Sequence, residues 1–134
     1  MVPDAVFQFI RGDEGPEVLD DMRRRIKAWL TDDAERPLPL HRRLGLGGPT
    51  AARLALRDHY LTEAAALLEG PSTWQRCRQL AEAARAFEVR RWPIWRRLDA
   101  PPPHAGPVDA MLWHARHLGG ELPATPENYL NILR

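Results

Sequence analysis

Apolar residues recur at intervals of three and four positions along most of the chain, with charged residues between them. This spacing gives each segment one apolar stripe and is the pattern of amphipathic helices packed around a core. The predicted helices span residues 5–11, 16–31, 51–69, 72–92, 107–118 and 125–134. The sequence therefore predicts an all-α fold, either an orthogonal array or an irregular bundle of five to seven helices.

Several residues mark where these helices begin and end. The predicted N-caps are Asp4, Thr50, Ser72 and Thr125. Ser72 is followed three residues later by Gln75, which makes a capping box. Residues 6–10 also fit a short strand, because periodicity does not separate helix from strand over so few positions. Pro93 must either kink the fourth helix or open a new one.

The apolar stripes define the predicted core. In the first helix Phe7 and Ile10 point inward. The third helix is apolar on two sides, which is typical of a central helix packed by neighbours on both. The stripe of the second helix consists of Leu19, Met22, Ile26, Trp29 and Leu30. The fourth helix buries Cys77, Leu80, Ala81, Ala84 and Phe87, and the fifth buries Val108, Met111, Leu112, Ala115 and Leu118.

The length of the chain predicts one domain that spans residues 1–134. A linker rich in proline and glycine occupies residues 36–49 and contains one helical turn at 40–44. A second, proline-rich break lies at residues 99–107. A chain of this size buries a core without disulfides, and its single cysteine excludes an internal disulfide.

Charge is unevenly distributed, although the whole chain has a net charge of only +1. Residues 1–35 carry nine acidic and five basic side chains, a net −4, whereas residues 36–134 carry nine acidic and fourteen basic ones, a net +5. Such asymmetry is typical of proteins that contact a polyanion. The eighteen arginines and single lysine are also what a GC-rich bacterial genome encodes. The placement of the arginines is therefore more informative than their number.

The segment Arg90-Arg91-Trp92-Pro93-Ile94-Trp95-Arg96-Arg97 places two indoles three residues apart between two arginine pairs. Trp and Arg contribute much of the binding energy at many recognition surfaces. On a helical wheel, one stripe opposite the apolar stripe of the fourth helix holds Trp74, Arg78, Arg85, Trp92 and Arg96. We interpret it as a solvent-exposed contact surface. In the alternative, both indoles pack inside the protein with arginine stems over their rings.

Arg91 and the arginines of the linker do not belong to this stripe. Arg91 projects onto the buried stripe, where it requires Glu88, an acid of the second helix or an interface. The linker and the start of the third helix carry Arg42, Arg43 and Arg53. Free amides and guanidiniums there suit a phosphate, and the alternative is a flexible hinge. A nucleotide-hydrolysing loop is excluded, because no strand precedes the glycines and no Gly-Lys-Ser/Thr follows them.

The sequence offers little for a metal centre or for catalysis. His114 and His117 have a chelating spacing, but nothing fixes a third and fourth ligand. We expect these histidines to point into solvent with Trp113, or to join Trp113 and Arg116 in a second contact patch. Cys77 lies on an apolar stripe, where a thiol is usually inert. No paired carboxylates indicate acid–base chemistry, so we expect no enzyme, no cofactor and no metal.

These patterns predict a small non-enzymatic helical module that binds nucleic acid, or a nucleoprotein complex, without base-specific readout. The predicted phosphate contacts are Arg78, Arg85, Arg90, Arg96 and Arg97. The predicted stacking groups are Trp74 and Trp92, and the residues that extend the track are Arg42, Arg43 and Arg53.

The alternative is a protein-binding adaptor or inhibitor encoded by a mobile genetic element. In that case the same Trp and Arg residues, and the acidic second helix, contact a nucleic-acid-binding protein complex. Self-assembly through the tryptophan faces is a third interpretation. The first residues lack a secretory leader, and no apolar run is long enough to cross a bilayer. We therefore expect a cytoplasmic protein without membrane contact.

Overall fold

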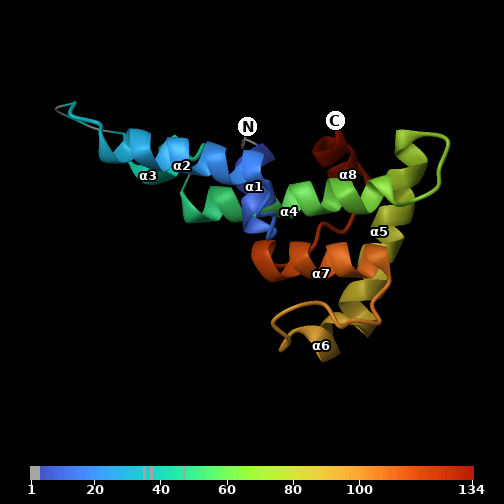
Figure 1. Ribbon diagram of the computed structural model, residues 1–134. Helices are drawn as coiled ribbons and strands as arrows, with labels where there is room; N and C mark the ends of the chain where they lie inside the picture. The colour runs from blue at the N-terminus through green and yellow to red at the C-terminus, as the bar shows by residue number, and fades with distance from the viewer. Residues whose placement is uncertain (1–3, 35, 37, 47) are drawn as a thin grey trace. The chain divides into compact units, whose positions relative to one another are not determined.

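The computed structural model describes residues 4–34, 36, 38–46 and 48–134 (Figure 1). Its elements are α1 (Asp4–Ile10), α2 (Pro16–Leu30), α3 (Leu40–Arg43), α4 (Pro49–Ala66), α5 (Thr73–Arg90), α6 (Trp92–Trp95), α7 (Pro107–Gly119) and α8 (Pro126–Leu133). No strand forms in these residues, which confirms the all-α prediction and overturns the short strand at 6–10. None of the described helices combines the length and apolar character that a membrane span requires.

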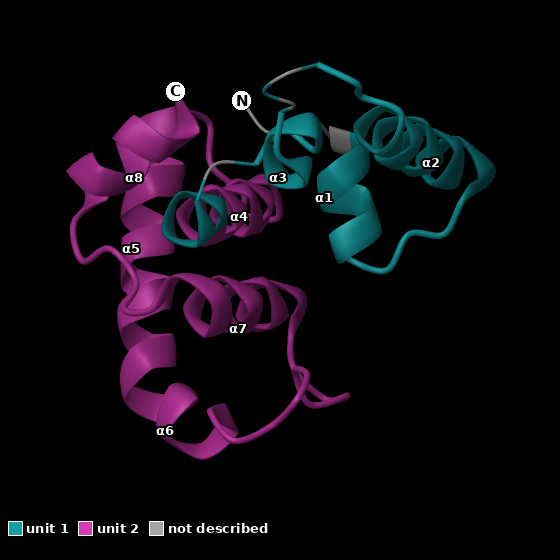
Figure 2. Ribbon diagram, turned by 90° about the vertical axis from the view of Figure 1, so that its left-hand side faces the viewer, with its two compact units in different colours: residues 1–52 teal, residues 53–134 magenta. Residues whose placement is uncertain are grey.

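The chain divides into two compact units, residues 1–52 and 53–134 (Figure 2). The boundary falls inside α4, and each unit has its own buried cluster. The cluster of the first unit is Val6, Val18 and Met22, with Leu44 and Leu46 packed against it. A single domain of residues 1–134, with a linker at 36–49 and a break at 99–107, stays a prediction.

In the first unit, α1 and α3 both contact α2. The predicted stripe of α2 is only partly covered. Met22 is buried, but Ile26 and Trp29 are each 38% exposed and Leu30 is 68% exposed. The prediction that the whole stripe is buried is therefore wrong, because the cluster of this unit reaches only the side of α2 that carries Val18 and Met22.

The first helix also differs from its prediction in one residue. Val6 and Phe7 are buried, whereas Ile10 is 45% exposed. Ile10 is the last residue of α1 and lies beside the turn that leads to Gly12, where the backbone φ is 97°. The chain leaves the helix there, so that Ile10 is not covered.

In the second unit, α4 and α7 run side by side, and α5 crosses them at one end (Figures 1 and 2). Both α6 and α8 also contact α5. The buried cluster of this unit consists of Tyr60, Leu61, Ala64, Ala65, Cys77, Leu80, Ala81, Ala84, Phe87, Trp95, Leu112, Trp113, Ala115, Leu122 and Tyr129. Most of the core predicted for the fourth and fifth helices is therefore confirmed.

The close approach of α4 and α7 depends on Gly119. A Cβ atom at Gly119 would lie 2.6 Å from Cδ and 2.7 Å from Cβ of Arg57. Because the Cβ of Arg57 is fixed to its backbone, a change of rotamer does not make room for it. Further along the two helices, the rings of Tyr60 and His114 stack with centroids 4.8 Å apart.

Among the described residues, the helix ends follow the predicted signals with one exception. The Ser72 hydroxyl accepts a hydrogen bond from the Gln75 amide (3.2 Å), and the Thr125 hydroxyl accepts one from the Asn128 amide (3.3 Å). Pro93 lies in the first turn of α6, so it opens a new helix. The predicted turn at 40–44 is present as α3. Thr50 is not a cap, since α4 begins at Pro49, and the side chain of Asp4, the cap predicted for the first helix, lies outside the described residues.

Trp113 is the largest error in the predicted core. We expected it to point away from the core, but it is 1% exposed, and its Nε1 donates a hydrogen bond to the carbonyl oxygen of Trp95 (3.1 Å). The reason is that α7 is contacted on two sides, by Tyr60 of α4 against His114 and by Trp95 of α6 against Trp113. The predicted apolar stripe covers only one side of α7, so a prediction based on that stripe misses the residues that are buried on the other side.

Two substitutions on α5 test its orientation. Leu80→Ala, at a residue with no exposed surface, should lower the free energy of unfolding by about 2–5 kcal/mol, because it leaves a cavity in the core. Val89→Ala, at a residue that is 70% exposed, should change it by less than about 0.5 kcal/mol. Urea unfolding followed by circular dichroism measures both values. Equal losses for the two variants would contradict this orientation.

Candidate nucleic-acid interface

The helix α5 has one buried and one exposed side. Its buried side consists of Cys77, Leu80, Ala81, Ala84 and Phe87. Its exposed side carries Arg78, Glu82, Arg85 and Val89. Successive side chains on a helix are about 100° apart, so packing of the apolar stripe directs these residues into solvent. The sequence therefore predicted this part of the stripe correctly.

Trp74, in the first turn of α5, is 40% exposed. Its indole is accessible to a ligand, and Arg78 follows one turn later on the same side of the helix. For this residue the structure agrees with the interpretation of an exposed contact surface and not with the alternative of a buried indole.

Trp92 is half-buried and packs against the core of the second unit. The Cζ atom of Arg116 lies 4.8 Å from the centroid of the Trp92 ring. Nε of Arg116 also donates a hydrogen bond to Oε1 of Glu88 (2.7 Å). One face of the indole is thus covered by a guanidinium that is itself held by a carboxylate. Trp92 therefore fits the alternative interpretation, in which an arginine lies over a packed indole. It also has less exposed ring surface for stacking than Trp74.

Arg91 differs from its prediction. Its side chain is 53% exposed, and its Nε lies 3.7 Å from Oδ2 of Asp109 in α7. Its Cζ lies 5.5 Å from the ring centroid of Trp95. The prediction of a buried guanidinium paired with Glu88 or with the second helix is wrong. The helix ends at Arg90, and the chain turns into α6 at Arg91, so the helical wheel of α5 does not extend to this side chain.

The other arginines of the predicted surface are free. The five predicted phosphate contacts are Arg78, Arg85, Arg90, Arg96 and Arg97, and all are exposed. No carboxylate of the described residues lies within ion-pair distance of any of these five side chains. Elsewhere in the described chain, the arginines with a carboxylate partner include Arg24, Arg25, Arg43, Arg57, Arg91 and Arg116. The structure therefore separates arginines engaged within the fold from arginines available to a partner.

The predicted extension of the track is only partly available. Arg42 and Arg53 are exposed and have no acidic partner among the described residues. Arg43 is occupied, because its Nη2 donates a hydrogen bond to Oδ2 of Asp32 (2.6 Å). Arg42 and Arg43 belong to the first unit and Arg53 to the second. The glycine at position 47 lies outside the described residues.

The ion pair with Arg43 changes the acidity of Asp32. The guanidinium of Arg43 donates a hydrogen bond to the carboxylate and holds the pKa of Asp32 below its ordinary value of 3.8. The backbone amide of Ala34, 3.1 Å from Oδ1, lowers the pKa further. The carboxylate is thereby fixed as a structural partner of α3.

The histidines of α7 are packed against aromatic rings. His114 stacks on Tyr60, and the His117 ring is stacked on Trp113 with centroids 4.7 Å apart. No group of three or more His, Cys, Asp or Glu side chains suited to a metal ion occurs in the described part of the chain. Burial raises the pKa of the Cys77 thiol, which disfavours the reactive thiolate.

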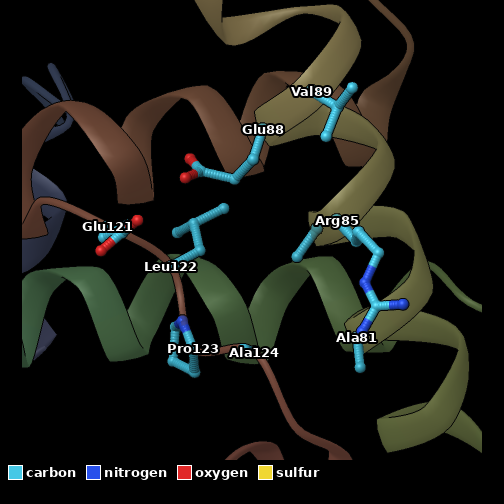
Figure 3. A pocket seen from close by; sticks show the side chains of 9 residues that line it. Ala81, Arg85, Glu88, Val89, Glu121, Leu122, Pro123 and Ala124 are labelled. Carbon is cyan, nitrogen blue, oxygen red and sulfur yellow. The ribbon is translucent and has the colours of Figure 1, made fainter.

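Sequence reasoning missed how two residues are placed near this surface. Arg116 covers Trp92 and pairs with Glu88, and Glu121 lies at a pocket beside Arg85 (Figure 3). Both arrangements bring together segments far apart in the sequence, and helical spacing along one segment carries no signal for them.

Comparison of the chain with protein-family models, with curated proteins and with solved structures gave no match.

The pKa of Asp32 gives a prediction about pH. Because this pKa is lower in the folded than in the unfolded protein, the pair with Arg43 stabilises the fold above pH 3.8, and its contribution is lost as the pH falls through the lowered folded-state pKa. Asp32→Asn should lower the free energy of unfolding at pH 7, and the difference from the native protein should vanish in acid. Urea unfolding at several pH values measures this difference, with Asp33→Asn as the control. A difference that does not depend on pH would show that the charge of Asp32 is irrelevant to stability.

Proposed function

We propose that the protein binds nucleic acid through the exposed arginines of α5, of α6 and of the residues that follow it, without base-specific readout by these arginines. The observation that carries the proposal is the division of the arginines into paired and unpaired sets. Phosphate oxygens accept charge-assisted hydrogen bonds from guanidiniums that have no internal carboxylate. The unpaired set contains all five residues that we expected to contact phosphate.

Trp74 adds a stacking group to this surface. Stacking of a base on an aromatic side chain contributes about 1–3 kcal/mol and does not depend strongly on the base. The exposed indole of Trp74 and the guanidinium of Arg78 are one helical turn apart, so one nucleotide can contact both. Trp92, whose ring is partly covered by Arg116, has a smaller part in this proposal.

Affinity for nucleic acid should therefore fall steeply with salt. A plot of the logarithm of the binding constant against the logarithm of the salt concentration is linear. For single strands its slope is about −0.7 for each phosphate that the protein contacts. Arg78→Gln and Arg96→Gln should each weaken binding of a labelled single-stranded oligonucleotide and reduce the slope by about 0.7. Fluorescence anisotropy at several salt concentrations measures both effects.

The matched control is Arg23→Gln, which removes an exposed arginine of the first unit without an acidic partner among the described residues. It should leave the slope unchanged. The proposal fails if no oligonucleotide binds at low salt, or if Arg23→Gln reduces the slope as much as Arg78→Gln does.

A protein-binding adaptor or inhibitor encoded by a mobile genetic element is the second candidate, and exposed apolar residues favour it. Val89 and Ile94 are 70% and 72% exposed beside the free arginines, and neither helps to bind phosphate. The form in which an acidic helix imitates nucleic acid has less support. In that form the contacting carboxylates are Asp20, Asp21, Asp32 and Asp33, and the first three are engaged by arginines within the first unit.

Charge reversal in the first unit separates the two candidates. Asp20→Lys with Asp33→Lys changes two exposed carboxylates and leaves Asp21 and Asp32 with their arginine partners. If the protein binds nucleic acid directly, the double variant should bind the oligonucleotide as tightly as the native protein or more tightly, because its net charge is more positive. Weaker binding in the same anisotropy assay would show that these carboxylates contribute to the interface.

A further inference from the structure

A pocket of about 280 Å³ lies between α5 and the segment that joins α7 to α8 (Figure 3). Its apolar lining comes from Ala81 and Ala84 of α5 and from Leu122 and Pro123 of the connecting segment. The pocket adjoins the proposed interface, since Arg85 belongs to both.

The connecting segment is held in place by contacts within the second unit. Gly120 adopts a φ of 75° at the end of α7 and turns the chain back. Leu122 is buried in the core, and the Tyr129 hydroxyl donates a hydrogen bond to the carbonyl oxygen of Pro123 (2.8 Å). The wall of the pocket is therefore part of the folded core, which lowers the entropic cost of binding a ligand.

Charged groups of opposite sign lie on opposite sides of the pocket. Figure 3 shows the Glu88 and Glu121 carboxylates on one side, the Arg85 guanidinium on the other, and Leu122 between them. Glu88 is partly neutralised by Arg116, whereas Glu121 is exposed and has no cationic partner among the described residues. The complementary ligand has a flat or apolar body, a negative group at one end and N–H donors at the other.

We propose that this pocket binds one guanine nucleotide, with its phosphate on Arg85 and the Watson–Crick edge of its base on Glu121. Guanine presents two adjacent N–H donors on that edge, which match the two oxygens of a carboxylate. Adenine and cytosine present an amino group beside a ring acceptor. Uracil presents one N–H between two carbonyl oxygens, which repel a carboxylate. Guanine is therefore the base that fits best.

Two other ligand classes fit less well. An aliphatic side chain of a protein would cover the apolar lining but would offer no donor to Glu121 and no acceptor to Arg85. A free amino acid carries its ammonium and carboxylate on one carbon atom, whereas the charges of the pocket are separated by Leu122. A nucleotide separates its phosphate from the donor edge of its base by the sugar and the ring.

This inference rests on the proposed function where the guanine nucleotide is part of a bound strand. A free guanine nucleotide presents the same phosphate and the same base edge to the pocket.

The test compares the binding of labelled uridine hexamers that carry a central guanine, hypoxanthine or uracil. The guanine hexamer should bind about tenfold more tightly than the uracil hexamer. The hypoxanthine hexamer, which lacks the amino group, should lie between them. Glu121→Gln should abolish the preference for guanine over uracil, and it should not lower the affinity for the uracil hexamer.

Glu69→Gln is the matched control, because Glu69 is exposed and does not line the pocket. It should leave the preference for guanine intact. Circular dichroism verifies that both variants are folded. A second arm titrates guanosine monophosphate and guanosine by calorimetry. Arg85→Gln should lower the affinity for guanosine monophosphate and leave the affinity for guanosine unchanged, because only the monophosphate carries the phosphate that Arg85 binds.

The outcomes separate the inference from the proposed function. If all three hexamers bind equally and with a steep salt dependence, the pocket does not read guanine, and the proposed function stands. If no hexamer binds but guanosine monophosphate does, and Glu121→Gln weakens it, the pocket is a free-nucleotide site, and the proposed function fails. If neither hexamers nor monophosphate bind, both are overturned.

Discussion

Burial of the apolar side of α5 is the interaction on which the rest of the second unit depends. Leu80, Ala84 and Phe87 are almost completely buried in the cluster shared with α4, α7 and the residues after it. Once these side chains are in the core, helical periodicity directs Arg78 and Arg85 into solvent. The same burial places Arg85 beside the segment that contains Leu122. The exposed cations and the pocket are therefore two consequences of one packing arrangement.

The ion pairs show how the fold treats its arginines. Three partly buried guanidiniums, those of Arg25, Arg43 and Arg116, each have a carboxylate partner. Removing a charge from water without a partner is costly, so this pairing is what stability requires. The arginines on the exposed side of α5 are hydrated and need no such partner. The proposed contact with nucleic acid uses their fixed positive charge, at a surface that also carries Trp74.

Local signals predicted the parts of the fold that depend on local chemistry. Ser72 with Gln75, and the proline at position 93, set the boundaries of α5 and α6, and the stripe from Cys77 to Phe87 identified the buried side. Contacts between distant segments carried no such signal. Trp113 is buried because α7 is contacted by both α4 and α6, and Arg91 pairs with Asp109 across a proline-rich break. The pocket combines Arg85 with Glu121, so it exists only in the folded chain.

The most direct test of the central claim observes individual guanidiniums. Nuclear magnetic resonance spectra that resolve the arginine Nε–Hε groups can be followed while a short single-stranded oligonucleotide is added. The account predicts shifts for Arg78, Arg85, Arg90, Arg96 and Arg97, and none for the paired side chains of Arg25, Arg43 and Arg116. Shifts that spread equally over paired and unpaired arginines, or that leave the unpaired set unchanged, would contradict it.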